Sequence, residues 1–138
     1  MSRSCYSDDL DNWTLIRWRG AVASAIRGKR GQAFLREMLA ALDALPEKRL
    51  IGEELEKDGE VCALGAVGKA RGIDMSNIDP EDYDAVAATF NIPDAFAREI
   101  MFVNDDSLWW KEATPEKRFD IVRSWVVKNL TNSKQDGG

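Results

Sequence analysis

The residues from Phe34 to Pro46 constrain the fold more than any other stretch of this sequence. Apolar side chains recur there at spacings of three and four, which places them along one face of an α-helix. Proline cannot continue a helix interior, so the helix ends before Pro46. The stretch therefore predicts an amphipathic helix that buries one face, with these apolar members: Phe34, Leu35, Met38, Leu39, Leu42 and Leu45.

Similar patterns predict further helices on both sides of this one. Gly28 and Gly31 mark the break that separates it from an earlier helix. Asp79-Pro80 and Thr114-Pro115 each pair a capping residue with a proline at the first helical position, and so predict two helix starts. Apart from the helix that ends before Pro46, the expected helices cover about 12–27, 63–71, 80–90, 93–103 and 115–130.

Asp58-Gly59 is a two-residue turn signal between short segments with some strand character, which predicts a β-hairpin over about 49–62. A chain of 138 residues can bury its own core, and no repeat or linker divides it. The expected fold is therefore α+β and mainly α, a single compact domain of about six helices with one short β-hairpin. We expect the domain to span 12–130, with a flexible N-terminus over 1–11 and a disordered tail over 131–138.

Residues 58–72 read DGEVCALGAVGKARG, and their glycines suggest a phosphate-binding loop. The spacing fails, because Ala63 stands where the first glycine of a P-loop belongs and Ala70 replaces the hydroxyl that would hold magnesium. A glycine inside a helix costs roughly 1 kcal/mol relative to alanine, so a compensating contact is expected. We interpret Gly65 and Gly68 as places where another element packs against the helix backbone.

The sequence contains no histidine, which removes histidine general bases, Ser-His and Cys-His nucleophile pairs and the commonest metal ligand. Cys62 is expected at a helix N-terminus, where the local field favours a thiolate. A small buried cysteine that only packs is the commoner outcome. An enzyme that uses Cys62 with Asn104 or Asp105 stays an alternative, but we expect a non-catalytic protein with no cofactor and no metal site.

Charge is divided between two segments of opposite sign. Residues 17–36 carry a net charge of +6, and residues 74–106 carry nine acids against a single arginine. The first segment is a candidate nucleic-acid surface through Arg17, Arg19, Arg27, Lys29 and Arg30. The second is a candidate protein-binding surface that competes with nucleic acid, through Asp79, Glu81, Asp82, Asp84, Asp94, Asp105 and Asp106.

Two further segments are candidates for binding. Residues 86–100 space their apolar side chains as a helix-turn-helix does, with Asn91 where a left-handed turn residue is needed. The second helix of that segment is acidic, so a packed helical hairpin is the favoured interpretation. Trp109 and Trp110 form an aromatic pair in a predicted loop, and tryptophans are over-represented at the energetic centres of protein interfaces.

The chain resembles a family of small uncharacterised proteins found in phages, prophages and bacterial genomes. The resemblance covers roughly residues 19–127 and rests on the segments RGKRGQAFLREMLAALDALPEKRLI, DGEVCALGAVGKARGID, the pair Asn104-Asp105 and TPEKRFDIVRSWV. It implies an origin in a mobile element and supplies no catalytic residue. Accessory roles follow from such an origin, and small acidic phage proteins that block host defence complexes, as anti-CRISPR proteins do, are one class.

The leading functional prediction is therefore a non-catalytic, cytoplasmic accessory protein that binds a host protein or a protein–nucleic acid complex, with inhibition of a host defence complex as one such role. No apolar run approaches the roughly 20 residues that a membrane helix needs, so no membrane association is expected. Nucleic-acid binding through the basic segment or through 86–100 is the alternative from a different class. The two alternatives differ in which charged segment they require to be accessible.

Overall fold

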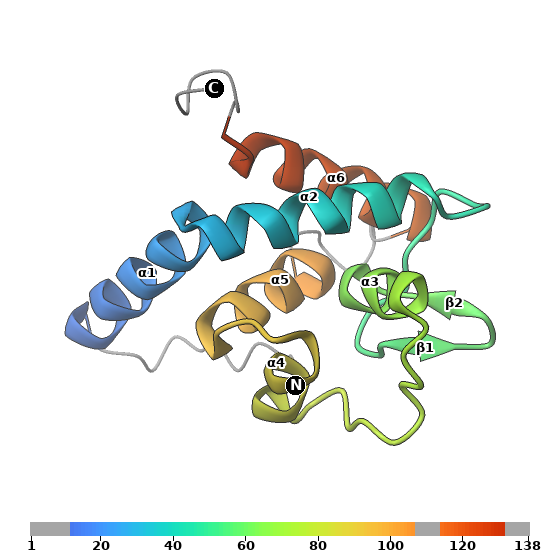
Figure 1. The fold of residues 1–138 in the computed structure, drawn as a ribbon, viewed down its shortest axis with the longest axis horizontal. Helices are drawn as coiled ribbons and strands as arrows, with labels where there is room; N and C mark the ends of the chain where they lie inside the picture. Colours follow the sequence, from blue (N-terminus) through green and yellow to red (C-terminus); the bar gives the residue numbers. More distant parts are fainter. Residues whose placement is uncertain (1–11, 107–113, 132–138) are drawn as a thin grey trace.

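The computed structural model describes residues 12–106 and 114–131 (Figure 1). Within these ranges the chain forms six helices and one antiparallel hairpin, which confirms the predicted α+β, mainly α, single domain. The predictions for 1–11 and for 132–138 lie outside the described residues. The elements are α1 (Asn12–Arg27), α2 (Lys29–Asp43), β1 (Glu56–Lys57), β2 (Glu60–Val61), α3 (Ala63–Arg71), α4 (Tyr83–Phe90), α5 (Asp94–Asp106) and α6 (Pro115–Asn129).

Helix α2 is the element around which the others pack. It runs across the molecule beside α6, with α3 and α5 beneath it in the view of Figure 1, and it contacts α1, α3 and α6. Leu35, Met38 and Leu42 on its predicted apolar stripe are fully buried. Burial of each such side chain contributes about 1.5–3 kcal/mol, so this face accounts for much of the hydrophobic stabilisation.

The break between α1 and α2 falls at Gly28 alone, and Gly31 lies inside the first turn of α2. Gly31 is needed for another reason: a Cβ there would stand 1.8 Å from the carbonyl oxygen of Ala25. The missing side chain lets α2 begin directly against the last turn of α1. The two helices therefore meet at a tight corner.

Helix α3 confirms the close-packing interpretation of its glycines. A Cβ on Gly65 would stand 1.9 Å from the carbonyl oxygen of Leu55, and a Cβ on Gly68 would stand 2.5 Å from the sulfur of Met75. Gly72 ends the helix in the left-handed conformation, with φ of 72°. The small residues of 62–72 thus allow Leu55 and Met75 to pack directly against the backbone of α3.

The hairpin turns at Asp58 and Gly59, both with positive φ, as the sequence predicts. Its ladder joins only Glu56–Lys57 to Glu60–Val61, which is shorter than the predicted range of 49–62. The segment before β1 is irregular, because Glu53 takes a left-handed conformation with φ of 65°. It is still attached to the end of β2, since Ile51 N donates to Val61 O at 2.9 Å.

Two helix ends near the acidic segment differ from prediction. The start at Asp79-Pro80 is wrong: α4 begins at Tyr83, with Asp82 as its N-cap, and Asp79 instead accepts a hydrogen bond from Glu81 N at 2.9 Å. Helix α5 runs on to Asp106, beyond the predicted end near 103. The extension occurs because Asn104 is buried and bonded to Ala63 at the start of α3 and to Ile51, which holds the last turn of α5 in place.

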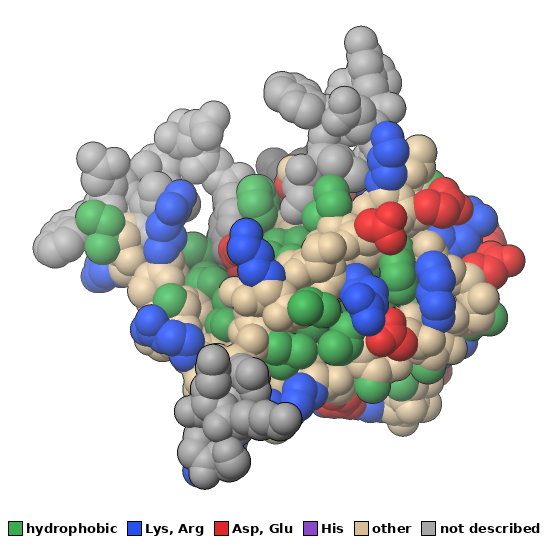
Figure 2. Space-filling model, turned by 90° about the horizontal axis from the view of Figure 1, so that it is seen from above, with side chains coloured by type: hydrophobic (Ala, Val, Ile, Leu, Met, Phe, Trp, Pro, Cys, Tyr) green, Lys and Arg blue, Asp and Glu red, His purple; other side chains and the backbone are tan. Residues whose placement is uncertain are grey.

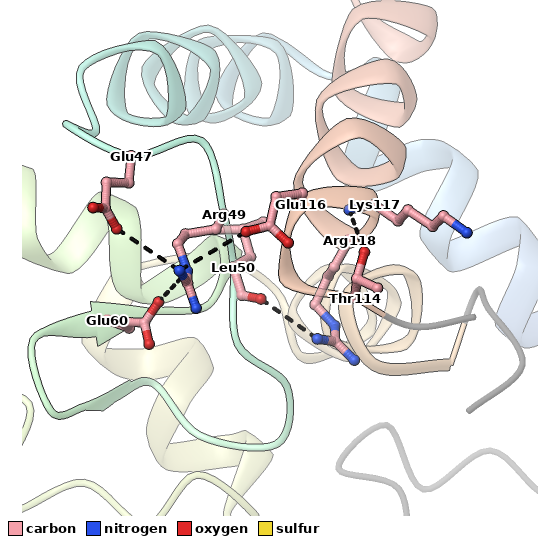
Figure 3. A network of polar contacts seen from close by, with 8 residues as sticks. All are labelled: Glu47, Arg49, Leu50, Glu60, Thr114, Glu116, Lys117 and Arg118. Carbon is pink, nitrogen blue, oxygen red and sulfur yellow. Dashed lines mark hydrogen bonds and ion pairs between the residues drawn. The ribbon is translucent and has the colours of Figure 1, made fainter. Parts of the chain in front are cut away.

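Helix α6 starts as predicted, with Thr114 as N-cap and Pro115 in the first turn. An ion-pair cluster joins this start to the hairpin (Figure 3). Arg49 contacts Glu60 of β2, Glu116 of α6 at 3.8 Å and Glu47 at 3.9 Å. None of the helices described is long and apolar enough to cross a membrane.

Candidate functional site

Six cationic side chains lie along α1 and α2, and together they form what we call the basic surface. On the face shown in Figure 2, Lys and Arg side chains at the left, over α1, stand largely apart from acids, whereas both signs are interspersed at the right. All six members are exposed to solvent. They are the five sequence candidates and one more: Arg17, Arg19, Arg27, Lys29, Arg30 and Arg36.

The cations of the basic surface make no hydrogen bond, ion pair or ring contact within residues 12–106 and 114–131. The arginines of the later elements are all engaged. Arg71 donates two hydrogen bonds to Glu37, at 2.6 and 2.7 Å, and lowers the pKa of that carboxyl below its ordinary value. Arg123 binds Asp43 at 2.8 Å in the same way. Among the residues that the structure describes, only the basic surface therefore presents a group of arginines free to bind an external anion.

The corner that carries Lys29 and Arg30 is fixed by a buried amide. Gln32 is 5% exposed, and its Nε2 donates to Ile26 O at 2.7 Å and to Asn129 O at 3.0 Å. Its Oε1 accepts from Thr131 N at 2.8 Å. A buried amide with all these partners ties the end of α1, the start of α2 and the end of α6 into one rigid unit.

A hollow of about 550 Å³ opens beside this corner. One wall comes from residues between 24 and 31, including Lys29 and Arg30, and the other from residues between 87 and 93 at the α4–α5 turn. The hollow thus joins the two segments that the sequence offered as separate nucleic-acid candidates. Helical spacing also places Arg17 on the same face of α1 as Ser24 and Gly28.

The segment 86–100 has the predicted turn but not a free recognition helix. Asn91 takes the left-handed conformation, with φ of 57°, between α4 and α5. Arg98 of α5 is held between two rings, 4.2 Å from that of Trp18 and 4.5 Å from that of Tyr83. The cation of the proposed second helix is therefore used inside the fold, which supports the packed-hairpin interpretation.

Several predicted acidic site residues accept hydrogen bonds from backbone amides. Asp82 caps α4 by accepting from Ala85 N at 3.1 Å, and Asp79 closes the turn before it. Asp105 accepts from Glu53 N at 3.0 Å and from Asn104 Nδ2 at 2.8 Å. These three carboxylates have local structural roles, although their charge still contributes to the surface potential.

Two of the acids instead face one another. The carboxyls of Asp84, in α4, and Asp94, in α5, lie within hydrogen-bonding reach, which raises the pKa of Asp94 above its ordinary value. Burial also raises this pKa, and the charge of Arg98 lowers it. Glu81 and Asp106 are exposed. The acidic segment is thus partly committed to caps and partly strained by like charge. Trp109 and Trp110 lie outside the described residues.

The segments that carry the family resemblance meet around Asn104, which is 3% exposed. Its Oδ1 accepts from Ala63 N at 3.0 Å, and its Nδ2 donates to Ile51 O at 2.9 Å. Arg118 of α6 donates through Nε to Asn104 O at 2.8 Å and through Nη1 to Leu50 O at 3.4 Å, the latter drawn in Figure 3. Asn104 is therefore a structural junction.

Cys62 lies beside this junction, 1% exposed, and its Sγ accepts from Gly65 N at 3.3 Å. A nucleophile must reach its substrate, so a thiol at this depth gives no support to the alternative of an enzyme centred on Cys62. Among the side chains described, no group of three or more Asp, Glu or Cys is placed to share a metal ion.

Comparison with protein-family models, curated proteins and solved structures gave no match. The sequence identified the cations of the basic surface but missed the wall opposite them. That wall contains the apolar residues Ala87, Ala88, Ile92 and Pro93, together with Asn91. The only sequence signal was the weak helix-turn-helix spacing, which gave no reason to place this turn beside the corner of α1 and α2.

Proposed function

We propose that this protein binds nucleic acid through the basic surface. The observation that carries the proposal is that its six exposed cations have no partner within the described residues, whereas the arginines elsewhere in the described chain are engaged. Cations without internal partners bind phosphates without first breaking an ion pair. They also release the counterions of the nucleic acid, which provides most of the sequence-independent affinity.

The net charge of −5 agrees with binding through one surface. A strongly cationic protein would adsorb to nucleic acid in many orientations, whereas the acids of this chain repel phosphates from its other faces. The buried contacts of Gln32 hold the backbone of the corner that carries Lys29 and Arg30 in place before binding. Because the backbone of this corner is already ordered, ligand binding adds little entropic cost there.

The test is fluorescence anisotropy with a labelled oligonucleotide over a series of salt concentrations. The double variant Lys29→Glu/Arg30→Glu should weaken binding at least tenfold at low salt and reduce the slope of log K against log salt by about 2. The variant should fold, because both positions are exposed and lie in the first turn of α2, where carboxylates interact favourably with the helix dipole.

The matched control reverses two other exposed lysines, in Lys69→Glu/Lys117→Glu. These side chains also have no partner within the described residues, but they belong to α3 and α6. The control changes net charge by the same amount, so it should weaken binding by only a small factor. Equal losses in the two double variants, or no binding by the native protein at low salt, would refute the proposal.

A second proposal is that the acidic segment binds a cationic protein surface, including the inhibitory role that the phage resemblance implies. It is supported by the Asp84–Asp94 pair, whose mutual repulsion a cationic partner would relieve. Retention of a stoichiometric host protein by the native chain, reduced in Asp84→Asn/Asp94→Asn, is the expected result of a pull-down. Retention that is insensitive to both substitutions would rule out this surface.

A further inference from the structure

The hollow beside the corner of α1 and α2 has the chemistry of a pocket for a planar ring. Its walls include Ala25 of α1, Ala87 and Ala88 of α4, and Ile92 and Pro93 of the turn. Its volume of about 550 Å³ lies within the range of pockets that hold small organic groups. Short apolar side chains leave space for the flat face of a ring without blocking its entry.

Polar and charged residues also line the hollow. The amide of Asn91 and the hydroxyl of Ser24 line it, and neither side chain has a hydrogen-bond partner within 12–106 and 114–131. An amide offers both donors and an acceptor, which suits the hydrogen-bonding edge of a nucleobase. Lys29 and Arg30 line the same hollow and can bind the phosphates next to that base.

We infer that the hollow takes one unstacked base of a single-stranded nucleic acid while the basic surface binds the flanking phosphates. The inference rests on the proposed function and adds the class of strand that is bound. A duplex keeps its bases stacked and paired, so a base could enter this recess only after it is flipped out, which costs its stacking and pairing energy. A single strand enters at little cost.

The preference for a single strand also follows from the arrangement of the cations. Arg17 shares a face of α1 with Ser24 and Gly28, seven residues before Ser24, so a strand with its base in the hollow can continue along α1 toward Arg17. Seven residues of helix span about 10 Å. Arg17 thus lies on a path that leads out of the hollow.

The test compares three labelled probes in the same anisotropy assay: a single-stranded oligodeoxyribonucleotide, a duplex of the same length, and a strand of the same phosphate count whose sugars carry no bases. The native protein should bind the base-containing strand roughly tenfold more tightly than the abasic strand, because stacking of one base in an apolar site contributes about that factor. It should also prefer the single strand to the duplex. An RNA single strand of the same sequence shows whether the protein prefers RNA or DNA.

Ala88→Phe fills the hollow from an exposed position on α4 and should abolish the preference for the base-containing strand. Affinity for the abasic strand and the salt dependence should stay unchanged, because the basic surface is intact. Ala70→Phe makes the same change at an exposed site on α3 and should leave the preference as it is. Asn91→Gly is a second test if Ala88→Phe fails to fold, because glycine keeps the left-handed conformation while removing the amide.

The outcomes separate this inference from the proposed function. Equal affinity of the native protein for base-containing and abasic strands would overturn the inference and leave binding through the basic surface intact. So would a duplex bound as tightly as the single strand, or a preference that survives both Ala88→Phe and Asn91→Gly. Failure of all three probes to bind would overturn the inference together with the proposed function.

Discussion

The basic surface and the acidic segment of residues 74–106 carry net charges of similar magnitude and opposite sign, but their charged side chains have different roles in the fold. Asp79, Asp82 and Asp105 accept hydrogen bonds from backbone amides and so hold helix ends and a loop in place. The cations of the basic surface have no such role within the described chain. Charge that stabilises its own fold and charge that is free to bind another molecule are indistinguishable by counting residues.

The difference follows from the chemistry of the two kinds of side chain. A short carboxylate reaches the free amides of a helix N-terminus, whereas lysine and arginine have no acceptor with which to cap those amides. An acid-rich segment with several helix starts therefore uses its acids locally. The cations of α1 and α2 lie on exposed helix faces where no acid is within reach, so their charge stays available.

The largest change in stability is expected at the corner of α1 and α2, which carries part of the basic surface. Gly31→Ala should lower the free energy of unfolding by about 2 kcal/mol or more, because the new methyl group would collide with the carbonyl oxygen of Ala25. Chemical denaturation measures the loss. Gly20→Ala is the matched control, since nothing lies within 4 Å of its new methyl group and alanine favours the helix by about 1 kcal/mol. If both substitutions stabilise the protein, the corner is not the tight junction described.

Most of the helix boundaries were predictable, because they depend on local chemistry. Thr114 and Pro115 start α6, Gly72 ends α3 and Asn91 ends α4 for reasons that involve only neighbouring residues. The sequence also indicated that Gly65 lies against another element, because an interior glycine in a helix needs compensation. It did not identify that element as the backbone of Leu55.

The errors arise where contacts between distant segments decide the structure. Asp79 and Asp82 are equally good caps, and the choice of Asp82 depends on where α4 packs. Helix α5 extends to Asp106 because Asn104 binds Ala63 and Ile51, more than 40 residues earlier in the chain. The hollow requires the corner of α1 and α2 to meet the α4–α5 turn, which no local pattern specifies.

A smaller effect tests directly whether acids and cations are used differently. Asp82→Ala should lower the free energy of unfolding by about 1 kcal/mol, because it removes the cap of α4. Arg27→Ala should change it by less than about 0.5 kcal/mol, since its side chain is exposed and makes no hydrogen bond, ion pair or ring contact within the described residues. Thermal or chemical unfolding of the two variants gives the comparison. A loss at Arg27 as large as the loss at Asp82 would contradict it.

The smallest effect concerns the Asp84–Asp94 pair and its dependence on pH. The pKa of Asp94 is raised in the folded protein, so the native state binds more protons than the unfolded state between the ordinary value of 3.8 and the raised pKa. Across this window the contribution of Asp94 to stability falls as pH rises, and above it the contribution is constant. Asp94→Asn cannot ionise and should lose this dependence.

The unfolding free energies of the native protein and of Asp94→Asn should be measured from pH 3 to 7. As pH rises, the variant should become more stable relative to the native protein. The opposite trend should appear in Glu37→Gln, because Arg71 lowers the pKa of Glu37. The stabilisation from that ion pair is complete above the ordinary value of 4.5 and is lost as pH falls from there through the lowered pKa. Opposite slopes would show that one acid is held beside a like charge while another is held by a cation. Parallel slopes would mean that Asp94 in the acidic segment is no more destabilised by a like charge than the ion-paired acids of α2. The contrast between charges that stabilise the fold and charges that are free to bind would then depend on the cations alone.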